Sequence, residues 1–151
     1  MSSTVEGSKN AASIEDHVPY LLAQAHRNIH LGLDKILKNE GVQVEHWRIL
    51  TVISDEAGRS MGDLAKIVLM NHPALTKMLD RMVAKGLIHR LPDPEDHRRM
   101  LVYITNQGLE LYARLHAHAN KYNDAFYANL GPEKITQLKS LLEELIGGTA
   151  E

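Results

Sequence analysis

Apolar residues recur every three or four positions in the first part of the chain. Between residues 16 and 39 this spacing predicts one long amphipathic helix, which Gly41 closes. The apolar positions of this stripe are Val18, Leu21, Leu22, Ala25, Ile29, Leu33, Ile36 and Leu37. Residues 1–14 are small and polar and show no helical period, so we expect a flexible tail there.

The same period predicts two further helices before residue 69. The first covers residues 44–57 and ends before Gly58. Its inward positions are Trp47, Leu50 and Ile53. The second begins at Ser60, because Ser60 and Asp63 have the spacing of a variant capping box. It is short and is expected to bury Leu64, Ala65 and Val68.

A turn at residues 69–72 leads to the next amphipathic helix, which stops at Gly86. Pro73 suits the first turn of that helix, since its missing N–H would have been unpaired anyway. The expected inward stripe consists of Leu75, Met78, Leu79, Met82 and Val83. Two helices joined by so short a turn form a helix-turn-helix.

A charged hairpin follows this pair of helices. Its strands are predicted at residues 87–91 and 100–104, and Pro92 and Pro94 stiffen its tip. Thr105 then caps a helix of about 25 residues. Its apolar side carries Leu109, Tyr112, Leu115, Ala119, Tyr122, Phe126 and Leu130.

Gly131 and Pro132 break the chain before a last helix, whose apolar positions are Ile135, Leu138, Leu141, Leu142, Leu145 and Ile146. The predicted fold class is therefore mainly α with a small β-hairpin wing. Residues 43–105 form a winged helix-turn-helix, and residues 15–42 and 106–147 form flanking helical regions for dimerisation.

Composition narrows the possible functions. The 151 residues contain no cysteine, which excludes disulfides, thiolate metal sites and thiol redox sensors. The sequence shows neither a signal peptide nor an apolar run long enough to cross a bilayer, so a cytoplasmic protein is expected. The net charge is −2, but residues 60–104 hold seven Lys/Arg against five Asp/Glu, or +2. A local positive face is enough for DNA, because phosphate attraction decays within roughly 8 Å in physiological salt.

The outer face of the helix after the turn has the chemistry of a major-groove reader. Asparagine pairs with adenine, lysine and arginine donate to guanine or phosphate, and alanine or a threonine methyl meets the thymine methyl. Pro73 leaves first-turn amides free for a phosphate. The alternative is an ordinary solvated face. The outward residues are Asn71, His72, Ala74, Thr76, Lys77, Asp80, Arg81 and Lys85.

The hairpin tip presents two adjacent arginines, Arg98 and Arg99. A guanidinium on a stiff loop can enter a narrow minor groove. Neighbouring residues of a strand point to opposite faces, so we expect one arginine to reach DNA while the other pairs with Asp93 or Asp96. The alternative is an exposed hairpin with compensating charges.

These motifs together resemble the MarR family of bacterial transcriptional regulators, over about residues 16–146. The wing signature is Asp96 followed two positions later by Arg98. The resemblance implies a homodimer with interlocked terminal helices, in which Arg98 enters the minor groove and Asp96 holds it. The other matching runs are residues 47–50, 64–65, 75–82, 85–88, Arg90, 93–99 and 105–108.

A dimer also follows from the residues, because the terminal helices carry more apolar stripe than a small winged domain can cover. Two-fold symmetry predicts a near-palindromic operator with half-sites about 10 base pairs apart. The predicted contacts with double-stranded DNA are Ser60, Asn71, His72, Pro73, Ala74, Thr76, Lys77, Arg81, Arg90, Asp96, Arg98 and Arg99.

The family resemblance also implies release from DNA by a small molecule, often an aromatic acid. The candidate residues for binding this molecule provide aromatic side chains to contact its ring and a cation to pair with its carboxylate. They are Tyr20, Gln24, Arg27, His30 and Trp47. We therefore expect a repressor whose effector is an aromatic carboxylate or its CoA thioester, with no cofactor.

Two other functions stay open, a histidine-based regulator and a protein-binding adaptor. His26 and His30, or His116 and His118, could serve a metal- or pH-responsive regulator, although no metal ligand set is assigned. A helical adaptor that binds only protein would leave the wing arginines unexplained. An enzyme is not expected, because no phosphate loop, nucleophile elbow, paired-carboxylate constellation or zinc-protease motif occurs.

Overall fold

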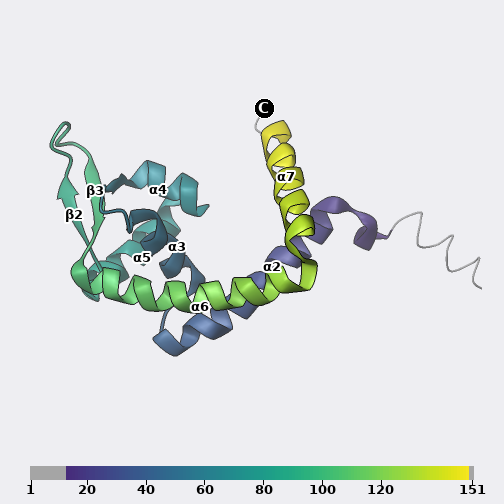
Figure 1. The fold of residues 1–151 in the computed structure, drawn as a ribbon. Helices are drawn as coiled ribbons and strands as arrows, with labels where there is room; N and C mark the ends of the chain where they lie inside the picture. Colours follow the sequence, from purple (N-terminus) through teal and green to yellow (C-terminus); the bar gives the residue numbers. More distant parts are fainter. Residues whose placement is uncertain (1–12, 150–151) are drawn as a thin grey trace, which may run out of the picture. The chain divides into compact units, whose positions relative to one another are not determined.

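The computed structural model describes residues 13–149 (Figure 1) and divides the chain into two compact units, one ending at Val44 and one beginning at Glu45. The first unit consists of η1 (Ile14–Asp16), α2 (Val18–Leu37) and η2 (Lys38–Glu40). The predicted long helix is confirmed. Its last turn tightens into a 3-10 helix, which Gly41 ends in the left-handed conformation at φ 73°.

The flexible tail predicted for residues 1–14 falls largely outside the described residues, and Ile14 belongs to η1. On α2, the apolar stripe is buried only toward its C-terminal end, at Leu33 and Leu37. Val18, Leu21 and Leu22 are exposed instead. The apolar stripe of α2 is therefore exposed over the first turns of the helix.

α3 (Val44–Ile53) is shorter than predicted. It ends at Ile53 and not near Ala57, because the following residues turn: the Ser54 hydroxyl donates to the Thr51 carbonyl at 2.8 Å, and Asp55 accepts from the Ala57 amide at 3.0 Å. Gly58 completes the turn at φ 80°. Leu50 and Ile53 are buried as predicted, and Trp47 is half-buried.

The helix-turn-helix consists of α4 (Met61–Val68) and α5 (His72–Ala84). Ser60 caps α4 by accepting from the Asp63 amide at 3.2 Å, which is the first half of the predicted capping box. The predicted core positions of α4 and α5 are buried, with one exception. Val83 is 40% exposed and lies off the buried stripe.

The predicted hairpin forms as β2 (Ile88–Pro92) and β3 (Met100–Ile104), paired antiparallel with Arg90 opposite Val102. A strand that the sequence did not reveal, β1 (Arg59–Ser60), pairs with the other edge of β3, so the sheet order is β1-β3-β2. The hairpin projects beside α4 and α5 (Figure 1). The structure thus confirms a mainly helical fold with a winged helix-turn-helix.

α6 (Asn106–Leu130) is anchored at the base of the hairpin. As predicted, the Thr105 hydroxyl caps it, accepting from the Gly108 amide at 3.0 Å; it also donates to the Gly86 carbonyl at 2.6 Å. The buried face of α6 differs from the predicted one, because Leu111 is buried while Leu109 and Tyr112 are half-buried.

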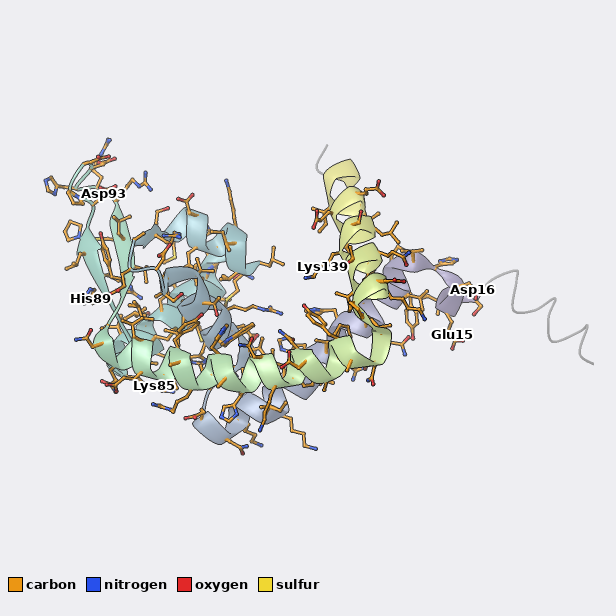
Figure 2. The ribbon with its side chains drawn as sticks, viewed as in Figure 1. Glu15, Asp16, Lys85, His89, Asp93 and Lys139 are labelled. Carbon is orange, nitrogen blue, oxygen red and sulfur yellow. The ribbon has the colours of Figure 1, made fainter. Side chains whose placement is uncertain are left out.

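α7 (Pro132–Thr149) follows a turn at Gly131, where φ is 87°. Ile135 is buried, and Lys139 Nζ lies over the Tyr127 ring of α6, 5.5 Å from its centre. Lys139 is labelled on α7 in Figure 2. Of the remaining apolar positions, Leu142 is half-buried, and four are exposed: Leu138, Leu141, Leu145 and Ile146. Between residues 13 and 149, no helix is long and apolar enough to cross a membrane.

Candidate nucleic-acid interface

The outer face of α5 is built as the sequence predicted. Every residue expected to point outward on this helix is exposed, from Asn71 at its cap to Lys85 just past its end. The apolar stripe on the opposite side holds the helix against the core, so the polar side chains stand free toward solvent. This face offers the mixture of amide, hydroxyl, methyl and cationic groups that suits base edges and phosphates.

Asn71, at the start of this face, is the N-cap residue of α5. Its side-chain oxygen accepts from the Ala74 amide at 2.8 Å and so caps α5. A bidentate pair with adenine needs that oxygen as well as the amide nitrogen. Such a pair would therefore cost the cap, and the Ala74 amide is no longer among the free first-turn donors.

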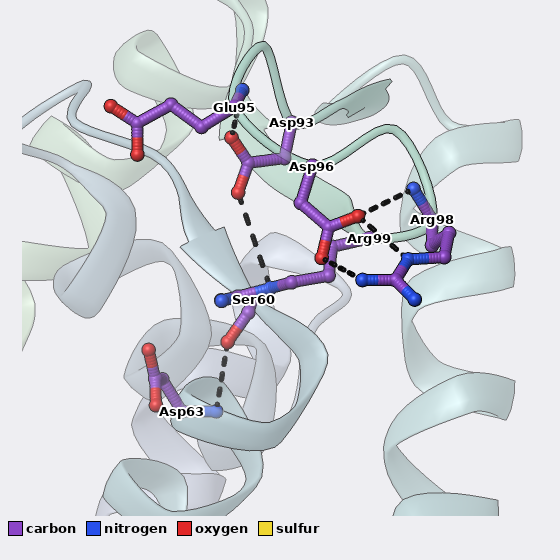
Figure 3. Close-up of polar contacts among 7 residues, drawn as sticks. All are labelled: Ser60, Asp63, Asp93, Glu95, Asp96, Arg98 and Arg99. Carbon is purple, nitrogen blue, oxygen red and sulfur yellow. Dashed lines mark hydrogen bonds and ion pairs between the residues drawn. The ribbon is translucent and has the colours of Figure 1, made fainter.

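The wing tip is a compact turn held by two aspartates (Figure 3). Asp93 is largely buried, and its carboxylate accepts from the Glu95 amide at 2.9 Å. The Asp96 carboxylate accepts from the Arg98 amide at 3.2 Å. The Asp93 amide donates across the turn to the Arg99 carbonyl at 2.8 Å. These bonds fix the backbone that presents both arginines.

Both arginines of the tip pair with carboxylates of the same turn. Arg98 Nε lies 3.0 Å from Asp96 Oδ1, and Arg99 Nε lies 4.0 Å from Asp93 Oδ2. The strand alternation from which a division between the two arginines was predicted does not apply, because both residues lie in the turn before β3. Which of them reaches DNA stays a prediction. The Arg98 side chain is nevertheless 91% exposed.

The electrostatics of the tip favour the ionised carboxylate. Hydrogen bonds from the Arg98 guanidinium and then from the Arg98 backbone amide lower the pKa of Asp96 below its usual 3.8. Asp96 therefore stays charged at neutral pH and holds the guanidinium within reach of solvent. An extended cation that is already ordered pays less entropy when it enters a groove.

A hollow of about 680 Å³ separates the wing from the helix-turn-helix. It brings together residues far apart in the sequence, including five predicted DNA contacts: Ser60, Thr76, Arg90, Arg98 and Arg99. Its remaining lining is Met61, Gly62, Asp63 and Met100. Three arginines, the first turn of α4 and a side chain of α5 thus border one concave surface, which suits the ridge of a sugar-phosphate backbone.

Sequence reasoning did not assign a role to Asp80. This residue lies on the outer face of α5, and its Oδ1 accepts from Arg90 Nη2 on β2 at 2.6 Å. Because the partners belong to different elements, helical spacing gives no sign of the pair. Figure 2 shows that β2 leads from the base of the hairpin past His89 toward the tip at Asp93.

The candidate effector residues lie in both units. α2 carries Tyr20 and His30, which are half-buried, and Gln24 and Arg27, which are exposed. On α3, the Trp47 indole N–H is buried and has no acceptor among the described residues. A buried donor of this kind is costly unless a partner arrives. The five residues stay predictions.

The histidine pairs are arranged differently from one another. The rings of His26 and His30 lie 5.6 Å apart on α2. On α6, His116 stacks on Tyr112 at 5.3 Å, while His118 is half-buried. His116 thus faces an aromatic ring of its own helix. His116 and His118, two positions apart, do not share one face of that helix.

Comparison with known proteins agrees with this geometry. Residues 40–99 match the sequence profile of the MarR family. The chain is 32% identical over 124 residues to the HTH-type transcriptional regulator FarR of Neisseria gonorrhoeae, covering 82% of this chain and 85% of FarR.

Two solved structures share the fold over nearly their whole length. The crystal structure of NadR in complex with 4-hydroxyphenylacetate superposes with a TM-score of 0.78 at 29% identity, covering 93% of this chain and 99% of that one. A mutant MarR from E. coli complexed with operator DNA gives 0.80 at 25% identity, covering 90% and 99%. Sequence profile, relatives and fold agree: the chain belongs to the MarR family of DNA-binding transcriptional regulators.

Proposed function

We propose that this protein is a homodimeric repressor that binds a near-palindromic operator and leaves it when a small aromatic acid binds. The observation that carries the proposal is the hollow between wing and helix-turn-helix, where Thr76 of α5 and the arginines of the wing border one concave surface. A reading helix and a basic finger on the two sides of a backbone-sized hollow are suited to neighbouring grooves of one duplex.

In this proposal α5 reads the major groove. Thr76, Lys77 and Arg81 stand on its exposed face, Ala74 offers a methyl group, and Asn71, His72 and Pro73 approach the backbone with the first turn of the helix. Ser60, at the start of α4, lines the hollow and there contacts the phosphates of the bound duplex.

The wing supplies the second contact. Arg98 enters the minor groove while Asp96 orients it, and Arg99 lies beside the backbone. Arg98 is the most exposed of the paired arginines, and the aspartates fix the turn that carries it. The geometry supports a finger that is ordered before it meets DNA.

The dimer rests on the uncovered apolar faces. α7 leaves Leu138, Leu141, Leu145 and Ile146 exposed, and α2 leaves Val18, Leu21 and Leu22 exposed. Faces of this kind are uncommon on a monomer and are covered when a second copy packs against them. A two-fold axis between the copies sets the half-sites about 10 base pairs apart.

The effector is proposed to be an aromatic carboxylate, free or as its CoA thioester. NadR, which shares the fold over 93% of this chain, was solved with 4-hydroxyphenylacetate. In this chain, the buried Trp47 indole N–H of α3 has no acceptor among residues 13–149. The other candidate residues, Tyr20, Gln24, Arg27 and His30, carry aromatic and polar groups on α2, and their part in binding the effector stays a prediction.

Selection from a random duplex library tests the proposal. The full-length protein should enrich two inverted half-sites about 10 base pairs apart, and 4-hydroxyphenylacetate in excess should weaken binding to the enriched duplex. Enrichment of no motif would overturn the DNA-reading part. Enrichment that 4-hydroxyphenylacetate, related aromatic acids and their CoA thioesters all leave unchanged would overturn the effector part alone.

A further inference from the structure

One ion pair joins the reading helix to the wing. Asp80 lies on α5, four residues after Thr76 and therefore on the same face. Arg90 lies on β2 opposite Val102, in the middle of the hairpin. The Arg90 Nη2 to Asp80 Oδ1 distance of 2.6 Å is that of a strong charge-assisted hydrogen bond.

We propose that Asp80 and Arg90 form a positioning pair, which fixes the wing against α5 and thereby sets the offset between the major-groove and minor-groove contacts. The inference rests on the proposed function, since it assumes that both elements meet the same duplex. It assigns Arg90 a role other than the direct DNA contact expected from the sequence. Neither residue needs to touch a base for the pair to determine specificity.

The surroundings of Arg90 support this role. Its side chain is only 30% exposed, and its Nε is buried without a hydrogen-bond acceptor among residues 13–149. Asp80 thus supplies the carboxylate that balances a half-buried cation. If Asp80 loses its charge, Arg90 loses the carboxylate that compensates its own charge, and β2 loses its ion pair with α5.

The position of the pair indicates that it acts on the placement of the wing relative to α5 more than on the charge of the DNA-binding surface. Thr76 and Arg90 line the same hollow as Arg98 and Arg99 at the wing tip. A shift of β2 relative to α5 would therefore move the arginine finger relative to the bases that Thr76 faces. Operators with the correct groove spacing would lose affinity, while sequence-independent attraction to phosphates would persist.

Two other roles make different predictions. If Arg90 bound a phosphate directly, its removal would lower the slope of log affinity against log salt by about 0.9 on any duplex. If Asp80 acted only by repelling DNA, its neutralisation would tighten binding to every sequence. A positioning pair predicts a loss confined to the operator, with an unchanged salt slope.

The chain contains a matched control pair. Arg59 Nη2 lies 2.7 Å from Asp55 Oδ2, with side chains 26% and 52% exposed, against 30% and 60% for Arg90 and Asp80. Asp55 lies in the turn after α3, and Arg59 lies four residues later in β1, so their pair does not join α5 to β2. Asp55→Asn removes a comparable ion pair without touching the proposed link.

The experiment measures the affinity of full-length Asp80→Asn, Arg90→Gln, Arg90→Lys and the double variant Asp80→Asn/Arg90→Gln. Each is titrated at several salt concentrations against the library-selected operator and a scrambled duplex, and melting curves check the fold. We expect Asp80→Asn and Arg90→Gln each to weaken operator binding about tenfold, with scrambled-duplex binding within about twofold of wild type. The double variant should lose no more than either single one, Arg90→Lys should recover most of the affinity, and Asp55→Asn should match wild type.

Additive losses in the double variant, a lower salt slope for Arg90→Gln on both duplexes, or tighter binding of Asp80→Asn to both would overturn the positioning role. An equal loss for Asp55→Asn would do so as well. If Asp80→Asn or Arg90→Gln does not fold, the binding of Arg90→Lys to the two duplexes still tests the proposal. Lysine keeps the positive charge that pairs with Asp80, so a tenfold fall in operator affinity for Arg90→Lys would contradict the positioning role. Failure of wild type to prefer the operator would instead reject the proposed function.

Discussion

The attachment of α6 to the base of the wing depends on the absence of a side chain at Gly108. A Cβ at this position would lie 2.2 Å from the Leu87 carbonyl oxygen and 2.8 Å from Ile104 Cγ1. The Leu87 backbone cannot easily retreat, because its carbonyl accepts from Thr105 at 3.0 Å and its amide donates to Met82 at 3.0 Å. Gly108→Ala must therefore push α6 away from the hairpin.

The expected cost follows from two opposing effects. Overpacking of a fixed site costs about 1–3 kcal/mol, and contact with backbone places this site at the upper end. Alanine in a helix recovers up to about 1 kcal/mol relative to glycine. We expect a net loss of about 2 kcal/mol in the free energy of unfolding, or a fall of roughly 4–8 °C in melting temperature.

Gly62→Ala is the matched control, because a Cβ at that helical glycine would meet nothing within 4 Å. It should leave stability unchanged or raise it by up to about 1 kcal/mol. Urea unfolding followed by circular dichroism, at one fixed protein concentration, measures both changes. A Gly108→Ala protein within about 0.5 kcal/mol of wild type would refute the packing argument.

Four further predictions concern the cap, the wing and the reading helix. Thr105→Ala removes a helix cap and the hydroxyl that donates to Gly86 at 2.6 Å, so urea unfolding should show a loss of about 1–2 kcal/mol; no loss would contradict the cap. Arg98→Ala should weaken operator binding in a mobility-shift titration while light scattering still finds a dimer, whereas unchanged affinity would count against the wing assignment. Thr76→Ala and Lys77→Ala should each cost about 1–3 kcal/mol and alter preference among operator variants if the side chain touches a base, while a uniform loss would indicate a phosphate contact. The lowered pKa of Asp96 means that folding favours its ionised carboxylate, so this residue contributes to folding stability above pH 3.8, and the contribution is lost as the pH falls through the lower pKa of the folded state. NMR titration of the carboxyl group should find that pKa below 3.8. A higher value would contradict the Arg98 hydrogen bond.

The sequence predicted most elements because their signals are local. Thr105 as a capping residue marked the start of α6, and the apolar strands on either side of the proline-containing tip marked the hairpin. β1 was missed, since two residues, Arg59 and Ser60, form a strand only by pairing with β3. The end of α3 was misplaced because turn bonds of Ser54 and Asp55 compete with the helix.

The candidate site was predicted as a set of residues but not as an arrangement. The exposed face of α5 follows from helical periodicity, which is a property of neighbours in sequence. The pairing of both wing arginines follows from the fold of the turn around Asp93 and Asp96. The Asp80–Arg90 contact joins a helix to a strand, so only tertiary structure reveals it.

Hydroxyl-radical footprinting of the selected operator, with wild type and Arg98→Ala compared at saturating protein, tests the central claim most directly. If two copies each read a major groove with α5 and insert a wing arginine into the adjacent minor groove, wild type will protect the backbone of both half-sites and of the minor grooves flanking them. The variant will lose the flanking protection alone. Equal footprints from the two proteins, or protection of a single half-site, would contradict the account.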